Sequence, residues 1–307
     1  MVATRSARRR ATPLLVLWRR DDARAAVVDY LPTESVAVLA MVAKPLREAQ
    51  SCLLHTAIKR RGKTLPSPPT TRACLDALLI GETHYFGEKW ERGMEEWRRV
   101  CYEQAPLARN SSVKQYPDGG YFLELLGPGS HHKGFARSLR AQNLLVTRLR
   151  VTMSYAELGD NPLLHGCAAG NVMLCGPGAN PEHGVSALSD FMGGPRFGSE
   201  GNGVSLVWLE YVHDGDNGPR MLVEGVTPNT RYVVDATFRH ESTSCFGTVD
   251  ISVNGQTVAE GIPIVYSPLR SIHLYNYGPA ISMIGGIEIW SERAAPNQVW
   301  KSDLGDY

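Results

Sequence analysis

The alternation of apolar and polar residues near the end of the chain limits its fold more than any other feature. Tyr232, Val234, Ala236 and Phe238 alternate with mainly polar residues, and the run from Thr248 to Val253 has the same pattern. Because successive side chains of a strand point to opposite faces of a sheet, these runs predict half-buried β-strands. Asn254-Gly255 follows the second run at once. Both residue types tolerate positive φ, so the pair predicts a tight hairpin.

Further short strands are predicted on both sides of this hairpin. They lie around Leu145–Met153, Val204–Val212, Met221–Glu224, Ile272–Leu274 and Ile287–Ile289. We therefore expect an antiparallel β-sandwich over residues 119–295. Residues 176–203 include eight glycines and three prolines. This composition predicts an irregular loop at the rim of a binding surface.

The first part of the chain is predicted to be helical. Two helices are expected over Ala23–Leu31 and Glu34–Ala43, with Thr33 as an N-cap and Pro45 in the first turn of a third helix. Farther on, Phe86, Trp90, Met94, Trp97 and Cys101 recur at intervals of four, four, three and four residues, which is the spacing of one helix face. We interpret that stripe as a packing face.

These predictions give a multidomain α+β chain, a small helical module followed by the sandwich. The expected parts are a basic tail (1–12), a helical module (13–60), a proline-containing linker (61–71), a helical connector (72–118), the sandwich (119–295) and a C-terminal tail (296–307).

Charge and cysteine content limit the classes of function. The chain has 32 basic and 31 acidic residues, so no overall field draws it to nucleic acid or to a membrane. No apolar run approaches the length of a membrane span. The six cysteines are scattered without Cys-x-x-Cys pairs, which favours reduced thiols and a cytoplasmic or nuclear location.

The segment from Arg19 to Gln50 resembles an F-box. The match consists of Tyr30-Leu31-Pro32, Glu34-Ser35 and the run Leu39-x-Met41-Val42-x-Lys44-Pro45-Leu46-Arg47-Glu48. The opening Leu-Pro of that family falls here on Arg19-Arg20, and its usual Trp is Leu46. The resemblance implies binding to the SCF adaptor and cullin scaffold of a ubiquitin ligase. It assigns the adaptor contacts to Leu31, Pro32, Leu39, Val42 and Leu46.

The segment from about Gly119 to Trp290 resembles a concanavalin A-like jelly roll of the laminin-G and lectin type. The order and spacing of Arg148–Val151, Thr230–Phe238, Val249–Gly255, Ile272–Asn276 and Ile287–Trp290 carry this resemblance. It implies a lectin-like sandwich that binds a protein or a glycan.

The sequence lacks the common catalytic motifs. Glycoside hydrolases need two carboxylates beside the scissile bond. The Glu-x-Asp-x-x-Glu run of the hydrolases with this fold does not occur: Asp250 stands alone on its strand, and Glu288 is followed by Ile289-Trp290-Ser291. The chain has no Gly-x-Ser-x-Gly, no phosphate-binding loop and no paired zinc spacing. We therefore expect a binding protein and not an enzyme.

Candidate ligand residues remain. Trp208, Tyr211, Tyr275 and Tyr277 are aromatic candidates for stacking on a sugar, with core packing as the alternative for each. Asp214 and Asp216 form a weak calcium-loop pattern, whose alternative is a polar hairpin turn. Arg148 and Arg150 are expected on the outward face of their strand.

The sequence indicates two main candidate functions, and a third possibility is an interaction scaffold whose helical cap covers one sheet. The first is a non-catalytic substrate-recognition adaptor of an SCF-type ubiquitin ligase, in which the sandwich captures a protein or glycan. The alternative is a stand-alone lectin-like protein that binds carbohydrate or peptide, with calcium as its one candidate cofactor.

Overall fold

The fold is known from a computed structural model. It describes residues 21–42, 47–101, 111–126, 133–139, 143–156, 168–176, 191–200, 203–209, 219–277, 281–295 and 297–301. The chain divides into two compact units, Met1–Glu82 and Thr83–Tyr307, which we call the helical unit and the β unit. Among the described residues, no helix has both the length and the apolar character needed to span a membrane.

The helical unit contains four described helices around a core of its own. They are α2 (Asp21–Tyr30), α3 (Thr33–Val42), α4 (Arg47–Arg60) and α5 (Thr71–Leu79). Val36, Leu53, Leu54 and Leu78 are fully buried in one apolar cluster. The two predicted helices over 23–31 and 34–43 are confirmed as α2 and α3, within two residues at each end. Pro45 lies outside the described residues.

The proline-containing segment 61–71 is not a linker between the two units. It connects α4 to α5 inside the helical unit, whose boundary falls after Glu82. The Lys63 ammonium donates to the carbonyls of Leu78 (2.6 Å) and Ile80 (2.5 Å), which ties the segment to the end of α5. The prolines interrupt the helix, but apolar residues of α5 such as Leu78 complete the core that α2–α4 begin.

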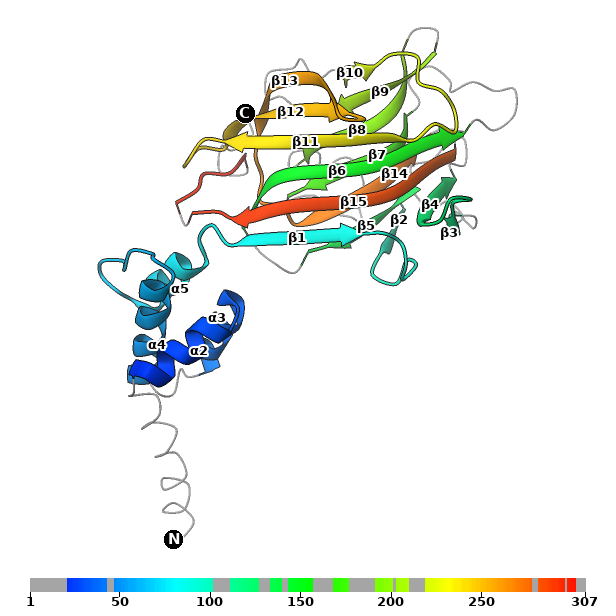
Figure 1. Ribbon diagram of the computed structural model, residues 1–307. Helices are drawn as coiled ribbons and strands as arrows, with labels where there is room; N and C mark the ends of the chain where they lie inside the picture. The colour runs from blue at the N-terminus through cyan, green and yellow to red at the C-terminus, as the bar shows by residue number, and fades with distance from the viewer. Residues whose placement is uncertain are drawn as a thin grey trace. The chain divides into compact units, whose positions relative to one another are not determined.

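The β unit is a sandwich of two antiparallel sheets (Figure 1). Within the described residues, sheet A has the order β13-β12-β11-β6-β15-β4-β3, with β1 also paired to β15, and sheet B has the order β10-β9-β8-β7-β14-β5-β2. The strands of sheet A are β1 (Thr83–Glu88), β3 (Ser112–Gln115), β4 (Tyr121–Leu126), β6 (Leu144–Ala156), β11 (Tyr232–His240), β12 (Phe246–Val253), β13 (Gln256–Val265) and β15 (Ile281–Arg293). Those of sheet B are β2 (Arg98–Cys101), β5 (Lys133–Ser138), β7 (Ala168–Cys175), β8 (Phe191–Glu200), β9 (Gly203–Leu209), β10 (Pro219–Val223) and β14 (Ser271–Tyr277).

The predicted alternation is confirmed along β11 and β12. Val234, Ala236 and Val249 are fully buried in the sandwich core, and the residues between them face outward. The predicted hairpin is also present, with Asn254 at φ 51° and Gly255 at φ 82°. The Asn254 side chain accepts a 2.8 Å hydrogen bond from the Val233 amide, so this turn also braces β11.

The helix predicted from the tryptophan stripe is wrong. Residues 83–88 form β1 and 98–101 form β2, so the sandwich begins near Thr83 and not near Gly119. Trp90 has a φ of 63°, which a helix does not allow, and packs on Trp97 with ring centroids 5.4 Å apart. Both indoles are buried. The helix-like spacing of Trp90 and Trp97 is therefore a coincidence, because a compact loop places both rings in the core.

The prediction of an irregular loop over 176–203 is also wrong in part. Residues 191–200 form β8, which lies between β7 and β9 in sheet B. A Cβ on Gly194 would lie 1.8 Å from the Val172 carbonyl oxygen. Glycine is therefore needed there because the backbone of β7 passes so close.

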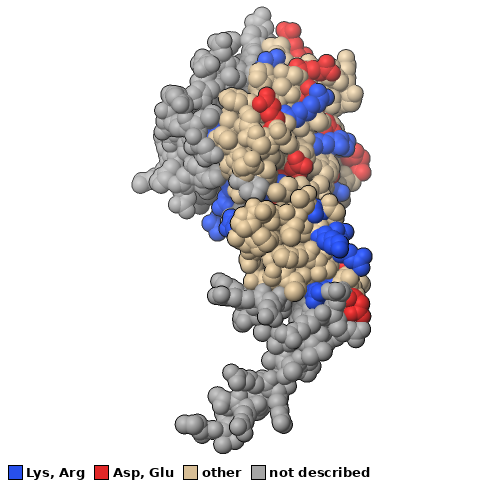
Figure 2. All heavy atoms as spheres, turned by 90° about the vertical axis from the view of Figure 1, so that its left-hand side faces the viewer, with Lys and Arg blue, Asp and Glu red and all other residues tan. Residues whose placement is uncertain are grey.

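Charges of both signs are interspersed on the surface seen in Figure 2, without a broad field of one sign. This distribution agrees with the nearly balanced totals of 32 basic and 31 acidic residues. A localised site is therefore a better guide to function than the overall charge.

Candidate functional site

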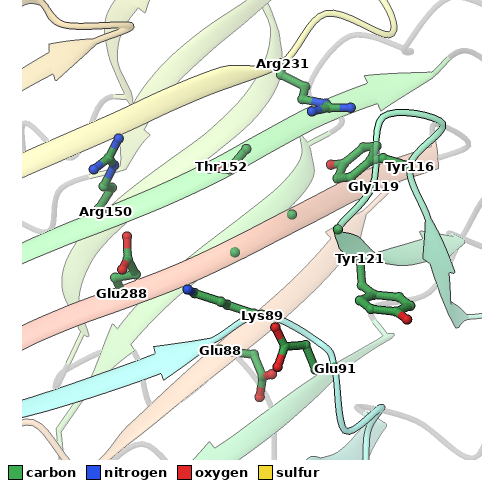
Figure 3. A pocket seen from close by; sticks show the side chains of 13 residues that line it. Glu88, Lys89, Glu91, Tyr116, Gly119, Tyr121, Arg150, Thr152, Arg231 and Glu288 are labelled. Carbon is green, nitrogen blue, oxygen red and sulfur yellow. The ribbon is translucent and has the colours of Figure 1, made fainter.

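A hollow of about 440 Å³ opens on the outer face of sheet A, and we call it the outer-face hollow (Figure 3). It lies wholly within the β unit. Its lining comes from the end of β1 and the loop after it, the β3–β4 turn, the middle of β6, the residue before β11 and the middle of β15. The lining residues are Glu88, Lys89, Glu91, Tyr116, Gly119, Gly120, Tyr121, Arg150, Thr152, Arg231, Gly285, Gly286 and Glu288.

Two glycines of β15 form the floor of the outer-face hollow. The register of β15 against β6 shifts between Ile284 and Gly286, which is a β-bulge. A Cβ on Gly285 would lie 2.8 Å from the Tyr116 hydroxyl, so only a residue without a side chain lets that ring lie across the strand. A Cβ on Gly286 would meet nothing closer than the Glu88 carbonyl oxygen at 3.5 Å. The floor at Gly286 is therefore open backbone that a ligand can approach.

The β3–β4 turn forms one wall. Gly119 and Gly120 have φ values of 92° and 75°, which only glycine adopts readily, and they fold the turn back over β15. The Arg231 guanidinium lies 3.7 Å above the Tyr116 ring and forms two hydrogen bonds with Asp118. Hydrogen bonding by Arg231 lowers the pKa of Asp118, and burial raises the pKa of the Tyr116 phenol. These contacts join Tyr116, Asp118 and Arg231, so the wall is held together as one unit.

Four charged side chains line the other part of the outer-face hollow. Glu288 of β15 and Arg150 of β6 are opposite one another in the register of the sheet. Figure 3 shows Arg150, Glu288 and Lys89 grouped on this side, with Glu91 below them. Glu288 accepts a 2.8 Å hydrogen bond from the Tyr85 hydroxyl, and this bond raises the pKa of Tyr85.

Three of these side chains have no partner in the described part of the chain. Lys89, Glu91 and Arg150 form no hydrogen bond, ion pair or ring contact with another described residue. Arg150 differs in this respect from Arg148, whose guanidinium is held by Asp235 and lies 4.9 Å from the centre of the Trp290 ring. Both arginines are exposed on the outward face of β6, as the sequence predicts.

Glu88 positions the loop that carries Lys89 and Glu91. Its carboxylate is buried and accepts hydrogen bonds from the Trp90 amide (2.8 Å), the Trp97 indole nitrogen (2.9 Å) and Arg137 (2.7 Å). All of its strong contacts are therefore internal. Glu88 shapes the outer-face hollow and is not free to bind a ligand.

Tyr121 is the aromatic side chain of the outer-face hollow that stays open. It is 39% exposed, and its ring contacts no other ring or cation among the described residues. The other lining tyrosine, Tyr116, already packs on Phe122 with centroids 4.4 Å apart.

The described residues of the lining carry balanced charges. They include three acidic and three basic side chains and no leucine, isoleucine, valine, methionine or phenylalanine. A ligand with a net charge of either sign would be repelled by those lining side chains that carry the same charge. An apolar side chain of a ligand would have no apolar pocket to occupy among these residues. The arrangement suits a neutral ligand with many hydrogen-bonding groups.

The predicted ligand aromatics do not gather in the outer-face hollow. Trp208 is fully buried in the sandwich core, with its ring 6.2 Å from that of Phe238, so it cannot stack on an external sugar. Tyr211 lies outside the described residues, as do Asp214 and Asp216 of the weak calcium pattern. Tyr275 and Tyr277 belong to β14, and the structure does not describe their side chains. Across the described residues, no cluster of three or more histidine, cysteine or acidic side chains could hold a metal ion.

The predicted adaptor contacts are only partly visible. Leu31 and Leu39 are half-buried against the core of the helical unit, while Pro32 is exposed. Val42 ends α3, with its side chain not described, and Leu46 lies outside the described residues.

Sequence reasoning missed most of the outer-face hollow. The sequence offers Glu288 only as half of a hydrolase pair, and Lys89 and Glu91 lie within the wrongly predicted helix. Pro117-Asp118-Gly119-Gly120 and Gly285-Gly286 were available as signals of a turn and a bulge. Nothing in the local sequence indicates that these segments meet.

Comparisons with known proteins give structural neighbours only. No protein-family model matches the chain, so the F-box resemblance is unsupported. A search of curated proteins found no match. Among solved structures, the globular domain of T. cruzi calreticulin is similar with a TM-score of 0.44 and 14% identity, over 68% of this chain and 87% of that one.

Two further solved structures show the same level of similarity. A carbohydrate esterase from Shiga toxin-encoding bacteriophage phi24B has a TM-score of 0.42 and 12% identity, over 66% of this chain and 92% of that one. Peanut lectin in complex with a nine-residue peptide has a TM-score of 0.40 and 11% identity, over 68% and 97%.

Proposed function

We propose that this chain is a lectin-like protein that binds a neutral carbohydrate in the outer-face hollow. The observation that carries the proposal is the combination of an open glycine floor with charged side chains that have no partner within the described residues. Lys89 and Arg150 offer only hydrogen-bond donors, and Glu91 and Glu288 offer only acceptors when ionised. A sugar hydroxyl both donates and accepts, so a polyhydroxyl ligand satisfies both kinds of group.

Charge-assisted hydrogen bonds add to this match. A hydrogen bond to an ionised group contributes about 1.5–3 kcal/mol, roughly twice the value for a neutral pair. Arg150 and Glu288 project from neighbouring strands whose positions the sheet fixes. They need no rearrangement of the backbone to receive a ligand, which reduces the entropic cost of binding.

A peptide is supported less well than a carbohydrate. Peptide-binding sites use apolar or aromatic pockets for anchoring side chains. Among its described residues, the lining of the outer-face hollow has no aliphatic side chain such as valine or leucine. Tyr121 alone does not make such a pocket, but its exposed ring offers a flat surface to the apolar face of a sugar.

The role of an SCF adaptor lacks a supporting observation. Leu31 and Leu39, two of its expected contacts, already pack on the helical unit's own core. We therefore base the proposed function on the β unit.

A direct test is to place a larger side chain on the floor of the outer-face hollow. Gly286 has an ordinary φ, and a Cβ there meets only the Glu88 carbonyl at normal contact distance. The Gly286→Leu variant should therefore fold and place an apolar side chain where the ligand would lie. Thr237→Leu is the matched control, because it adds the same side chain to the outer face of β11 outside the outer-face hollow.

The full-length protein and both variants would be applied to an array of neutral and acidic glycans, and positive glycans would be titrated calorimetrically. We expect neutral glycans to bind the parent and the Thr237→Leu control, and Gly286→Leu to weaken binding at least tenfold, or about 1.4 kcal/mol. Binding unaffected by Gly286→Leu, or no glycan bound at all, would overturn the proposal. Release of shorter saccharides during incubation would indicate an enzyme instead.

A further inference from the structure

The outer-face hollow continues along β15 as a line of outward residues. Gly286, Glu288 and Trp290 alternate with Ile287 and Ile289, which are buried in the core. Each outward residue is opposite a polar residue of β6, so three successive rows of this face each contain a hydrogen-bonding side chain. This line extends beyond the lining of the outer-face hollow, which ends at Glu288.

Tyr85 of β1 joins the outer-face hollow to the end of this line. It pairs with Trp290 in the register, and its ring lies 5.3 Å from the indole. Its hydroxyl donates to Glu288, which lines the outer-face hollow. The Tyr85 side chain is nevertheless 57% exposed. An aromatic surface therefore lies open to solvent next to the last charged group of the outer-face hollow.

The separation of these features exceeds one sugar ring. Trp290 is four positions after Gly286 in β15, and a strand rises about 3.4 Å per residue, so the distance along β15 is about 14 Å. Tyr121 stands at the other end, at the β3–β4 turn. A ligand that reaches both exposed tyrosines must be an extended chain.

The end of the line near Tyr85 carries little excess charge. The Arg148 guanidinium between Trp290 and β11 is hydrogen-bonded to the Asp235 carboxylate. The line therefore suits a neutral ligand throughout, as the lining of the outer-face hollow does.

We propose that the ligand is a linear neutral oligosaccharide that lies along β15, with one end in the outer-face hollow and the other on the Tyr85 ring. This inference rests on the proposed function and adds to it the length and direction of the ligand. Tyr85 contacts the distal sugar unit, while Gly286, Arg150 and Glu288 contact the unit in the outer-face hollow.

The test is a length series. The full chain would be titrated with neutral saccharides of one to six units, using β-1,4-linked glucose, α-1,4-linked glucose and β-1,4-linked mannose series. We expect the affinity for at least one series to rise at least tenfold from one unit to four and then level off. The Tyr85→Ala variant should bind the single unit as Tyr85→Phe does, because both lose the hydroxyl that orients Glu288. It should also lose most of the gain with length, which Tyr85→Phe keeps because its ring is still present.

Tyr30→Ala is the matched control, since Tyr30 is 89% exposed in the helical unit. It should retain the full gain with length. Two results would overturn the inference while leaving carbohydrate binding intact: an affinity independent of length in the parent, or a gain with length in Tyr85→Ala that equals the gain in Tyr85→Phe. If no saccharide in the series or on the array binds, the proposed function and this inference both fail.

Discussion

The carboxylate of Glu88 accepts a 2.9 Å hydrogen bond from the indole nitrogen of Trp97, nine residues later in the chain. The same carboxylate accepts from the Trp90 amide and from Arg137. The bonds close the loop between β1 and β2 around a buried charge and fix the backbone that carries Lys89 and Glu91.

Replacing Glu88 by glutamine should destabilise the β unit by about 3 kcal/mol. The variant removes the charge that Arg137 pairs with and leaves two donors with a weaker or misplaced acceptor. Urea unfolding measures the loss. Glu91→Gln is the control, because that side chain is exposed and has no partner among the described residues, so its change should stay within about 0.5 kcal/mol. Equal stabilities of the two variants would contradict the role of Glu88.

Gly194→Ala should destabilise the protein by about 3 kcal/mol or more, because its Cβ would overlap the backbone of β7 and a strand cannot move aside without losing its ladder. Gly198→Ala lies on the same strand, where the new Cβ would meet the Val207 side chain at an ordinary 3.6 Å. That control should change stability by less than about 1 kcal/mol. Thermal unfolding of the pair checks both expectations; a smaller loss for Gly194→Ala than for Gly198→Ala would be inconsistent with the packing of β8 on β7.

Stability should fall between about pH 6.5 and pH 4 because of His273. Burial lowers the pKa of His273 from 6.5 to about 4. The unfolded chain therefore takes up a proton before the folded chain does, and stability that is present above pH 6.5 is lost as the pH falls, by up to about 3 kcal/mol. His273→Gln should flatten this part of the curve of unfolding free energy against pH. An unchanged slope in the variant would show that other groups cause it.

Tyr85→Phe should weaken saccharide binding about three- to tenfold with almost no change in stability. The variant keeps the ring on Trp290 and removes only the hydroxyl that orients Glu288. The variant loses the hydrogen bond from Tyr85 to the charged Glu288. Saccharide binding weakens because the Glu288 carboxylate is then held in place less firmly. Calorimetric titration with the best saccharide of the length series measures the effect. Unaltered affinity for every length would mean that Glu288 does not depend on Tyr85.

The strands could be predicted wherever their own residues carry the pattern. In β11, Val234 and Ala236 alternate with Asp235 and Thr237, and burial of one face of a sheet enforces that alternation in any fold. The hairpin at Asn254-Gly255 could be predicted for a similar reason, because its positive φ values depend on those two residue types alone.

The loop at Trp90 and Trp97 could not be predicted in this way. Its spacing fits a helix, and only the buried acceptor at Glu88 makes the alternative stable. The strand β8 was missed for a related reason. Its glycines look like a loop until the close approach of Val172 is known.

The sequence by itself determined that the chain has helices followed by an antiparallel β-sandwich, because periodicity and turn chemistry act between neighbours in the chain. The tertiary structure alone decided where a ligand can lie. Tyr121, Arg150, Arg231 and Glu288 come together across strands that are far apart in sequence. Strand order and register bring these residues together. Both depend on long-range strand pairing, which no local sequence pattern encodes.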